Sequence, residues 1–260
     1  MKVSLALVAG LAFALTAKAG VKTEVVEYRQ GDAVLQGYLC YDESVTGKRP
    51  GVLVIHDWMG VSDETKMRAH MLAELGYVAL TADIYGKGVR PKNAQEAQAE
   101  AGKFYQDRGL LRARAKAGLD YLAARPEADP ARLAVMGYCF GGGASLELAR
   151  SGAPVKGVVT FHGALATPTP EDAKNIKGKV LVLHGADDPF VKQSDVTAFM
   201  DELRKAGADW ELVQYSGAVH GFTNRGAGND NSKGMAYNAE ADRRSWQAMK
   251  DFFHEIFGGM

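Results

Sequence analysis

A cysteine between glycines is the strongest chemical signal in this sequence. Cys139 is the centre of Gly137-Tyr138-Cys139-Phe140-Gly141, between an apolar strand-like run and a segment with helical spacing. This spacing is typical of a sharp strand-to-helix turn that presents a nucleophile, because glycines let the backbone fold back closely. The free N–H groups and the dipole of the following helix would favour a thiolate there. The pattern predicts a nucleophile; the alternative is a buried structural cysteine in a glycine-rich turn.

A thiol nucleophile needs a base, and the base needs a group that orients it. Asp187 and Asp188 follow the apolar run at 180–184, and His220 follows the strand-like run at 209–215. Taken singly, each is an ordinary loop residue. Their order along the chain, nucleophile then acid then histidine, each after its own strand, is that of α/β-hydrolases. The spacing alone leaves the choice between the two aspartates open.

Alternating strands and helices must position these residues. Two strand-like runs flank Gln30-Gly31-Asp32, which predicts an N-terminal antiparallel hairpin. Further strands are predicted at 51–56, 77–82, 132–136, 155–161, 179–184 and 209–215, and helices at 63–75, 92–124 (broken near 107–109), 141–150, 192–206 and 238–257. The alternation predicts an α/β fold with a mainly parallel central sheet, helices on both faces, and ligands at the carboxyl ends of the strands.

Composition and charge narrow the class further. The chain of 260 residues has a formal net charge of zero, ordinary globular composition and no basic block, which excludes a nucleic-acid partner of the usual basic kind. No linker or repeat divides it, so residues 20–260 are predicted to form a single domain. Two loops stand out: 166–172 contains two prolines, and 223–235 is long and rich in glycine and asparagine, as a lid could be. The sequence carries no signal for the oligomeric state.

The first 19 residues have the pattern of a secretory signal. Lys2 precedes the apolar run at 3–15, and Ala17-Lys18-Ala19 fits a cleavage site. The run is too short to span a bilayer comfortably, so we expect export to the periplasm or the medium without a stable membrane anchor. Cleavage would remove two lysines and no acid, and the net charge of zero would become −2. The alternative is a buried or interfacial N-terminal helix.

These motifs resemble the dienelactone hydrolase family of α/β-hydrolases over almost the whole chain beyond residue 19. The matching segments are Gly137–Gly142, Asp188–Val191, His220–Phe222 and Ala82–Tyr85. The resemblance implies the α/β-hydrolase fold and a catalytic triad of Cys139, Asp188 and His220. It favours Asp188 over Asp187, because the family's Gly-x-x-Asp-x-x-Val spacing fits a start at Gly185; Asp187 would then be a turn residue.

The resemblance also implies how the reacting carbonyl group would be held. The backbone N–H groups of Trp58 and Phe140 would form an oxyanion hole, in which each donor is typically worth about 3 kcal/mol in acyl transfer. Asp57 stands where the family commonly has a glutamate that holds the resting thiol, and its side chain is one methylene shorter, so a weaker switch is expected. Tyr85 is expected to form part of the pocket wall.

Dienelactone specialists of the family grip the substrate carboxylate with arginines. Here Lys87 stands at one such place, and Asn224 and Arg225 straddle the other. A lysine cannot make the same bidentate contact. The reaction is therefore better predicted than the substrate. We expect a hydrolase of a small-molecule ester or lactone, of carboxymethylenebutenolidase type, that forms a thioester and needs no cofactor.

Other interpretations remain open from the sequence. A broad-specificity exported carboxylesterase or thioesterase would use the same fold, and a non-catalytic protein could retain it. A redox-sensing protein could pair Cys139 with Cys40. His56, His162 and His184 lie near strand ends, but His-Glu-x-x-His and Cys-x-x-Cys spacings are absent from the sequence, so we predict no metal. His56 and His162 are expected to line the pocket or to satisfy loop carbonyls.

Overall fold

The structure is a computed structural model of the chain and describes residues 20–259. The predicted signal segment, residues 1–19, lies outside the described residues. Within residues 20–259, no helix is both long and apolar enough to cross a membrane.

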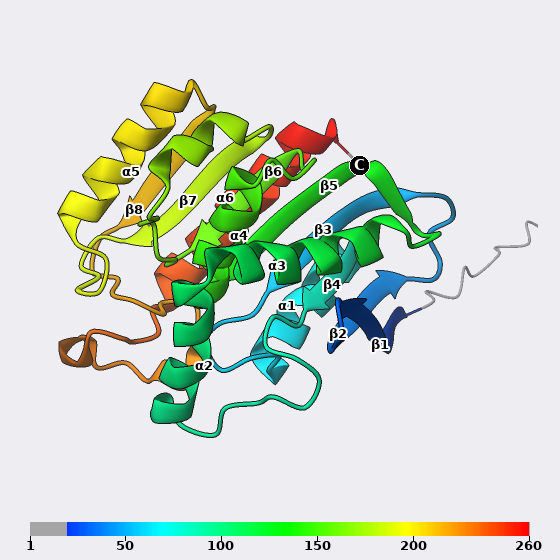
Figure 1. The fold of residues 1–260 in the computed structure, drawn as a ribbon, viewed down its shortest axis with the longest axis horizontal. Helices are drawn as coiled ribbons and strands as arrows, with labels where there is room; N and C mark the ends of the chain where they lie inside the picture. Colours follow the sequence, from blue (N-terminus) through cyan, green and yellow to red (C-terminus); the bar gives the residue numbers. More distant parts are fainter. Residues whose placement is uncertain (1–19, 260) are drawn as a thin grey trace, which may run out of the picture.

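A mixed sheet of eight strands forms the centre, in the order β1-β2-β4-β3-β5-β6-β7-β8 (Figure 1). The strands are β1 (Val21–Gln30), β2 (Ala33–Asp42), β3 (Arg49–Ile55), β4 (Val78–Ala82), β5 (Ala128–Tyr138), β6 (Gly157–Phe161), β7 (Lys179–Gly185) and β8 (Trp210–Tyr215). Strand β2 pairs antiparallel with β1 and β4, and all other neighbours are parallel. The predicted fold class and hairpin are confirmed.

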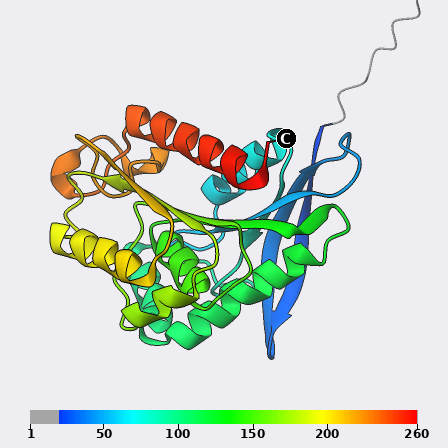
Figure 2. The same ribbon diagram turned by 90° about the horizontal axis from the view of Figure 1, so that it is seen from above.

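Helices cover both faces of the sheet. They are α1 (Asp63–Glu74), α2 (Ala94–Gln106), α3 (Arg108–Ala123), α4 (Phe140–Arg150), α5 (Gln193–Ala206) and α6 (Ala239–Phe257). Figure 2 shows α1 and α6 on one face and α3, α4 and α5 on the other. The predicted break between α2 and α3 falls at Asp107, which ends α2 and whose side chain accepts a hydrogen bond from the Leu110 N–H at 2.8 Å to begin α3.

The central strands are apolar on both sides because both of their faces are covered. All seven residues of β3 are buried. Leu53 and Ile55 pack into the core beneath α3, α4 and α5, while Val52 and Val54 pack into the core beneath α1 and α6. A strand buried on two faces reads as a continuous apolar run rather than an alternating one, which is why this strand could be recognised from sequence.

The strand register brings distant loops to one edge. Ile55 pairs with Gly137, Tyr138 with Phe161, and Phe161 with Leu183. The residues that follow β3, β5, β6 and β7 therefore start side by side at the carboxyl edge of the sheet. β5 is longer than predicted, because its first residues pair with the start of β3 ahead of a register shift.

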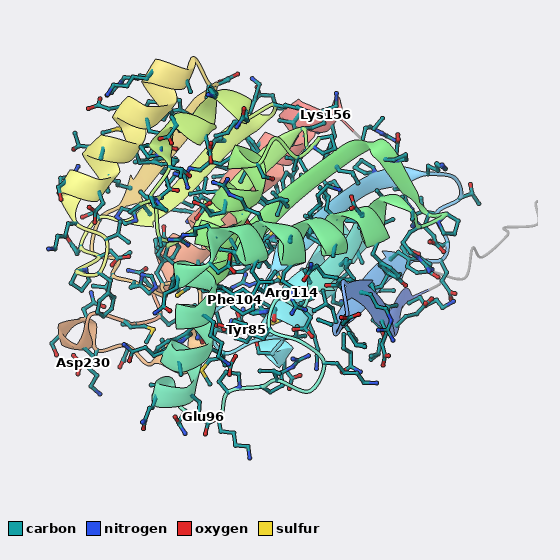
Figure 3. All side chains as sticks on the ribbon, in the orientation of Figure 1. Tyr85, Glu96, Phe104, Arg114, Lys156 and Asp230 are labelled. Carbon is teal, nitrogen blue, oxygen red and sulfur yellow. The ribbon has the colours of Figure 1, made fainter. Side chains whose placement is uncertain are left out.

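The two conspicuous loops contain short 3₁₀ helices that the sequence patterns did not predict. Pro170–Asn175 forms one in the proline-containing loop, and Arg225–Ala227 and Asn231–Lys233 form two in the long loop. Asp230 lies near the tip of the long loop (Figure 3). The loop then returns to the site: the His220 N–H donates to the Gly234 carbonyl at 3.2 Å, and the Ala236 N–H donates to the His220 carbonyl at 3.2 Å.

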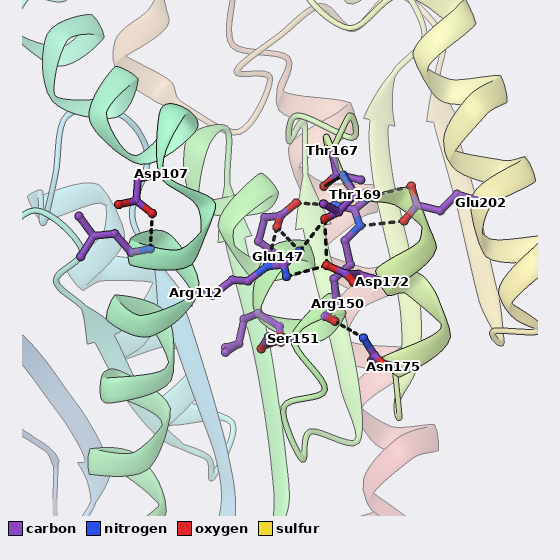
Figure 4. A network of polar contacts seen from close by, with 12 residues as sticks. Asp107, Arg112, Glu147, Arg150, Ser151, Thr167, Thr169, Asp172, Asn175 and Glu202 are labelled. Atoms are coloured by element: carbon purple, nitrogen blue, oxygen red, sulfur yellow. Dashed lines mark hydrogen bonds and ion pairs between the residues drawn. The ribbon is translucent and has the colours of Figure 1, made fainter.

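A buried ion cluster joins α3, α4 and α5 (Figure 4). The Arg150 guanidinium lies 2.7 Å from a Glu202 oxygen and 3.0 Å from a Glu147 oxygen, and the Arg150 and Glu147 side chains are each 1% exposed. Arg112 lies 2.8 Å from Glu147 and 2.7 Å from Asp172. Because Asp172 belongs to the proline-containing loop, the cluster ties that loop to α3 and α4.

Candidate active site

Cys139 occupies a strained turn between β5 and α4. Its φ of 53° and ψ of −115° lie outside the regions that most non-glycine residues adopt. Its N–H donates to the Phe161 carbonyl at 3.0 Å. A Cβ at Gly137 would lie 2.1 Å from the Gly141 carbonyl oxygen, and one at Gly141 would lie 2.2 Å from the Ile55 carbonyl oxygen. The flanking glycines are therefore required by close backbone approach, as the motif predicted.

One imidazole bridges the thiol and a carboxylate. His220 Nε2 lies 3.0 Å from Cys139 Sγ, and His220 Nδ1 lies 2.8 Å from Asp188 Oδ2. The other oxygen of Asp188 accepts hydrogen bonds from the N–H groups of Phe190 at 2.8 Å and Val191 at 3.3 Å. Asp187 instead accepts from the Gly217 N–H at 3.0 Å and so acts within the turn. The structure thus brings the three predicted residues together, with Asp188 as the acid that meets the histidine.

Opposite charges stabilise this arrangement. Burial disfavours a charged His220, but the neighbouring Cys139 thiolate and the hydrogen bond to Asp188 outweigh burial and raise the pKa of His220 to about 10. Burial would likewise raise the pKa of Asp188, yet its hydrogen bond to His220 and that residue's charge lower it. The geometry therefore suits a thiolate–imidazolium pair held by a carboxylate.

Trp58 and Phe140, whose backbone N–H groups the resemblance assigns to an oxyanion hole, both lie close to Cys139. Phe140 is the first residue of α4, so its N–H belongs to the first turn, which a helix leaves without intrahelical acceptors. Trp58 lies in the turn after β3 and lines the same cavity as Cys139. The Tyr85 hydroxyl donates to the Trp58 carbonyl at 3.0 Å and holds that turn in place.

Aromatic rings pack against Phe140, the residue that follows Cys139. The ring centroid of Tyr85 lies 5.4 Å from that of Phe140 and 5.6 Å from that of Phe104 in α2, and Figure 3 shows Tyr85 and Phe104 side by side. Tyr85 is buried and is absent from the described residues that line the cavity. Tyr85 therefore lies behind the residues that line the cavity, whereas the sequence analysis expected it to be part of the pocket wall.

His56 is a satisfied core histidine. Its Nδ1 lies 2.6 Å from the Asp57 carbonyl oxygen, to which it can donate, and its Nε2 accepts from the Ile84 N–H at 3.2 Å. Burial lowers the pKa of His56 to about 4, so the ring is neutral. This agrees with the expectation that His56 satisfies a loop carbonyl.

His162 and His184 are also buried near the triad. His162 has a φ of 39°, its Nε2 lies 2.8 Å from the Thr223 hydroxyl, and its ring centroid is 5.2 Å from that of His220. Burial lowers the pKa of both histidines. Among residues 20–259, no group of three or more His, Cys, Asp or Glu residues has a metal-binding arrangement.

The cavity beside Cys139 has two parts. A narrow inner pocket of about 20 Å³ is lined by Asp57, Trp58, Glu64, Thr65, Tyr138, Cys139, His162, His220, Gly221, Thr223, Asn224 and Met235. An outer groove of about 220 Å³ is lined by Trp58, Cys139, Phe190, His220 and Met235. The sequence analysis did not assign Glu64, Thr65, Phe190 or Met235 to the site. Glu64 and Thr65 carry no local motif, Phe190 was quoted only as part of the segment Asp188–Val191, and Met235 only as the end of the long loop.

Lys87 and Arg225, which the sequence analysis considered for binding a substrate carboxylate, lie outside the cavity wall. The Lys87 ammonium pairs with Glu27 of β1 at 2.7 Å, and Arg225 is exposed on a 3₁₀ helix. Neither is among the described residues that line the cavity, although Asn224, next to Arg225, is. Asp57 does line the inner pocket, but its Oδ1 accepts from the Met59 N–H at 2.8 Å.

Both cysteines are free thiols. Cys40 is fully buried in β2, where it pairs with Thr23 and Ala79, and burial raises its pKa to about 12. The structure therefore contains no Cys40–Cys139 link of the kind that the redox interpretation requires.

Comparisons with known proteins agree with this geometry. The sequence profile of the dienelactone hydrolase family matches residues 35–257. A Synechocystis protein provisionally named as a carboxymethylenebutenolidase is 27% identical over 250 residues, which are 90% of this chain and 96% of that protein.

Solved structures show the same fold. A dienelactone hydrolase-like promiscuous phosphotriesterase from metagenomic libraries is 42% identical, with a TM-score of 0.88 over 91% of this chain and 99% of that one. A dienelactone hydrolase-type structure from Klebsiella pneumoniae is 24% identical, with a TM-score of 0.77 over 90% of this chain and 98% of that one, and supports the fold alone.

Proposed function

The chain belongs to the dienelactone hydrolase family of hydrolases, and from that premise we propose that it cleaves ester or lactone bonds through a triad of Cys139, His220 and Asp188. The observation that carries the proposal is the single imidazole that lies 3.0 Å from the Cys139 sulfur and 2.8 Å from an Asp188 oxygen. A nucleophile, a base and an orienting acid within hydrogen-bond reach are what covalent acyl transfer needs.

In the first half of the reaction the Cys139 thiolate attacks the carbonyl carbon. The carbonyl oxygen becomes an oxyanion, which the N–H groups of Trp58 and Phe140 stabilise. When the carbon–oxygen bond of the ester breaks, the leaving alkoxide takes the proton from the His220 imidazolium. An acyl thioester on Cys139 remains.

In the second half water hydrolyses the thioester. Once Cys139 is acylated it carries no negative charge, so a major cause of the raised His220 pKa is gone. Burial then favours the neutral imidazole, which can take a proton from water. The balance between burial and a neighbouring charge would thus change His220 from an acid into a base within one cycle.

The proposal is tested with activated esters and intact-mass measurement. Cys139→Ala should lower turnover of 4-nitrophenyl esters by about 10³-fold or more, as removal of a triad nucleophile usually does. Wild-type protein quenched during turnover should carry one acyl group that hydroxylamine removes, and digestion should locate it on Cys139.

The matched control is Cys40→Ala, which removes the other thiol and should keep wild-type turnover, since Cys40 lies in the core away from the cavity. Full activity of a folded Cys139→Ala protein would refute the mechanism. Acyl label at another residue would do the same.

A second candidate reaction is hydrolysis of neutral phosphotriesters. This reaction is favoured because the chain is 42% identical to a promiscuous phosphotriesterase and covers 99% of that protein. Cys139 would form a bond to phosphorus while an aryl oxide leaves, and water would then cleave the sulfur–phosphorus bond. Release of 4-nitrophenolate from diethyl 4-nitrophenyl phosphate, lost in Cys139→Ala, would support it. A rate equal to that without protein would exclude it.

Export is a separate proposal, based on the pattern of residues 1–19. We propose that the mature protein begins after Ala19 and acts in the periplasm or the medium. N-terminal sequencing of the protein recovered from its native host tests this, and a chain that still begins at Met1 would refute it.

A further inference from the structure

The walls of the cavity differ in chemistry on the two sides of Cys139. In the outer groove, the side chains of Trp58, Phe190 and Met235 surround the sulfur and the His220 ring. Phe190 is 60% exposed, and its ring centroid lies 5.5 Å from that of His220. An exposed aromatic ring beside a reactive group suits an apolar part of a ligand.

The inner pocket is narrow and acidic. Its volume of about 20 Å³ is close to what a single water molecule needs. Asp57 and Glu64 both line it. The Arg68 guanidinium lies 3.3 Å from Glu64 but 2.9 Å from Asp242, so its charge is shared between two carboxylates.

Among residues 20–259, the cavity wall offers a substrate carboxylate no unpaired cation, because the His220 ring is already held between Cys139 and Asp188. Among the described residues that line either part, none is a lysine or an arginine. Lys87 is paired with Glu27, and Arg225 is exposed outside the lining. Arg108 lies 4.9 Å over the ring of Tyr105, which packs on Phe140, and neither Arg108 nor Tyr105 lines the cavity.

We infer that this site selects uncharged esters or lactones with an apolar part and rejects substrates that carry a carboxylate. The inference rests on the proposed hydrolase function and names its substrate class. A carboxylate in the outer groove would lose water without gaining a partner. A carboxylate directed toward the inner pocket would meet Asp57 and Glu64, and like charges at close range repel. The apolar part of the substrate would rest on Trp58, Phe190 and Met235.

A matched pair of substrates tests the inference. 4-Nitrophenyl hydrogen adipate carries a terminal carboxylate, and its methyl ester differs mainly in lacking that charge. We expect kcat/KM for the methyl ester to exceed that for the acid at least tenfold at low ionic strength. The ratio should fall as salt is added, because salt screens the repulsion.

Charge-removing variants identify the source of the selectivity. Glu64→Gln and Asp57→Asn should each reduce the ratio of the two kcat/KM values severalfold. The control is Glu171→Gln, which removes one exposed carboxylate outside the cavity wall and should leave the ratio unchanged. Because ratios are compared, a general loss of activity in a variant does not affect the result, and the salt series on wild-type protein stands if a variant does not fold.

The possible outcomes distinguish a failure of the inferred substrate preference from a failure of the proposed hydrolase function. If neither ester is hydrolysed above background, the proposed function is wrong. If both are hydrolysed and the acid is as good a substrate as its methyl ester, the inference is overturned. A preference for the acid that disappears in Arg108→Gln would also overturn it, by showing that Arg108 reaches the substrate.

Discussion

The Tyr85 hydroxyl donates a hydrogen bond to the carbonyl oxygen of Trp58 at 3.0 Å. Tyr85 follows β4 and Trp58 follows β3, two neighbouring parallel strands, so the contact joins two loops at the carboxyl edge of the sheet. A carbonyl held in place fixes the peptide plane before Met59 and restrains the residue whose own N–H faces the cavity in the proposed mechanism. Tyr85 is thus a positioning residue and does not itself line the cavity.

Tyr85→Phe should lower kcat for ester hydrolysis by about three- to tenfold, with little change in KM, because loss of one hydrogen bond of about 1 kcal/mol loosens the proposed oxyanion hole. Steady-state kinetics check this. The control is Tyr77→Phe, at the opposite end of β4, which should keep wild-type kcat. A rise in KM alone would instead indicate that Tyr85 contributes to ground-state binding.

The pKa of His220 should depend on its two partners. Removing a negative neighbour destabilises the imidazolium, so Cys139→Ala and Asp188→Asn should each lower the pKa from its wild-type value of about 10. The ring would then release its proton at a lower pH in both variants. An NMR titration of the His220 Cε1 proton, assigned with His220→Asn, measures the shift. An unchanged pKa in Cys139→Ala would contradict the thiolate–imidazolium pair.

The two thiols should differ in reactivity at pH 7. Cys139 is half-buried beside His220, whereas Cys40 is fully buried and its pKa is raised to about 12. One equivalent of iodoacetamide should therefore label Cys139 and leave Cys40 unmodified, as peptide mapping would show. In His220→Asn the rate of labelling should fall about tenfold, because the Cys139 sulfur loses the imidazole nitrogen that lies 3.0 Å away and can take its proton. Labelling of Cys40 first would show that the fold opens readily around β2.

The glycines of the turn should tolerate no side chain. Gly137→Ala places a Cβ against the Gly141 carbonyl oxygen and should lower the free energy of unfolding by more than about 3 kcal/mol. The control is Gly102→Ala in α2, where no atom lies within 4 Å of the added Cβ. That change should raise the free energy of unfolding by about 0.5–1 kcal/mol, through helix propensity. Urea denaturation measures both, and equal effects would refute the packing explanation.

Arg150 should be needed for stability because it is buried with its partners. Arg150→Met leaves the carboxylates of Glu147 and Glu202 without their shared cation and should cost about 3–5 kcal/mol. Arg204→Met removes an exposed arginine that pairs with Asp201 at 2.8 Å and should cost about 1 kcal/mol or less. A comparison of urea midpoints tests the difference, and a small effect at Arg150 would show that water reaches the cluster.

Much of the fold and the triad could be predicted from the sequence because the signals are local. The glycines around Cys139 must be close to it in the chain, since the turn that they permit spans only a few residues. The apolar run of β3 and the turn at Gly31 likewise depend on neighbouring residues. The order of Cys139, an aspartate and His220 needed only the rule that parallel strands end at one edge of the sheet.

The substrate side of the site was decided by tertiary structure. Lys87 is close in sequence to Tyr85, yet its ammonium pairs with Glu27 across the hairpin. Glu64 carries no motif, yet the placement of α1 brings it to the wall beside Cys139. The net charge of a cavity is the sum of the charges of its lining side chains, which come from separate segments of the chain. No local pattern contains that sum, because only packing determines which long side chains face the cavity and which pair elsewhere.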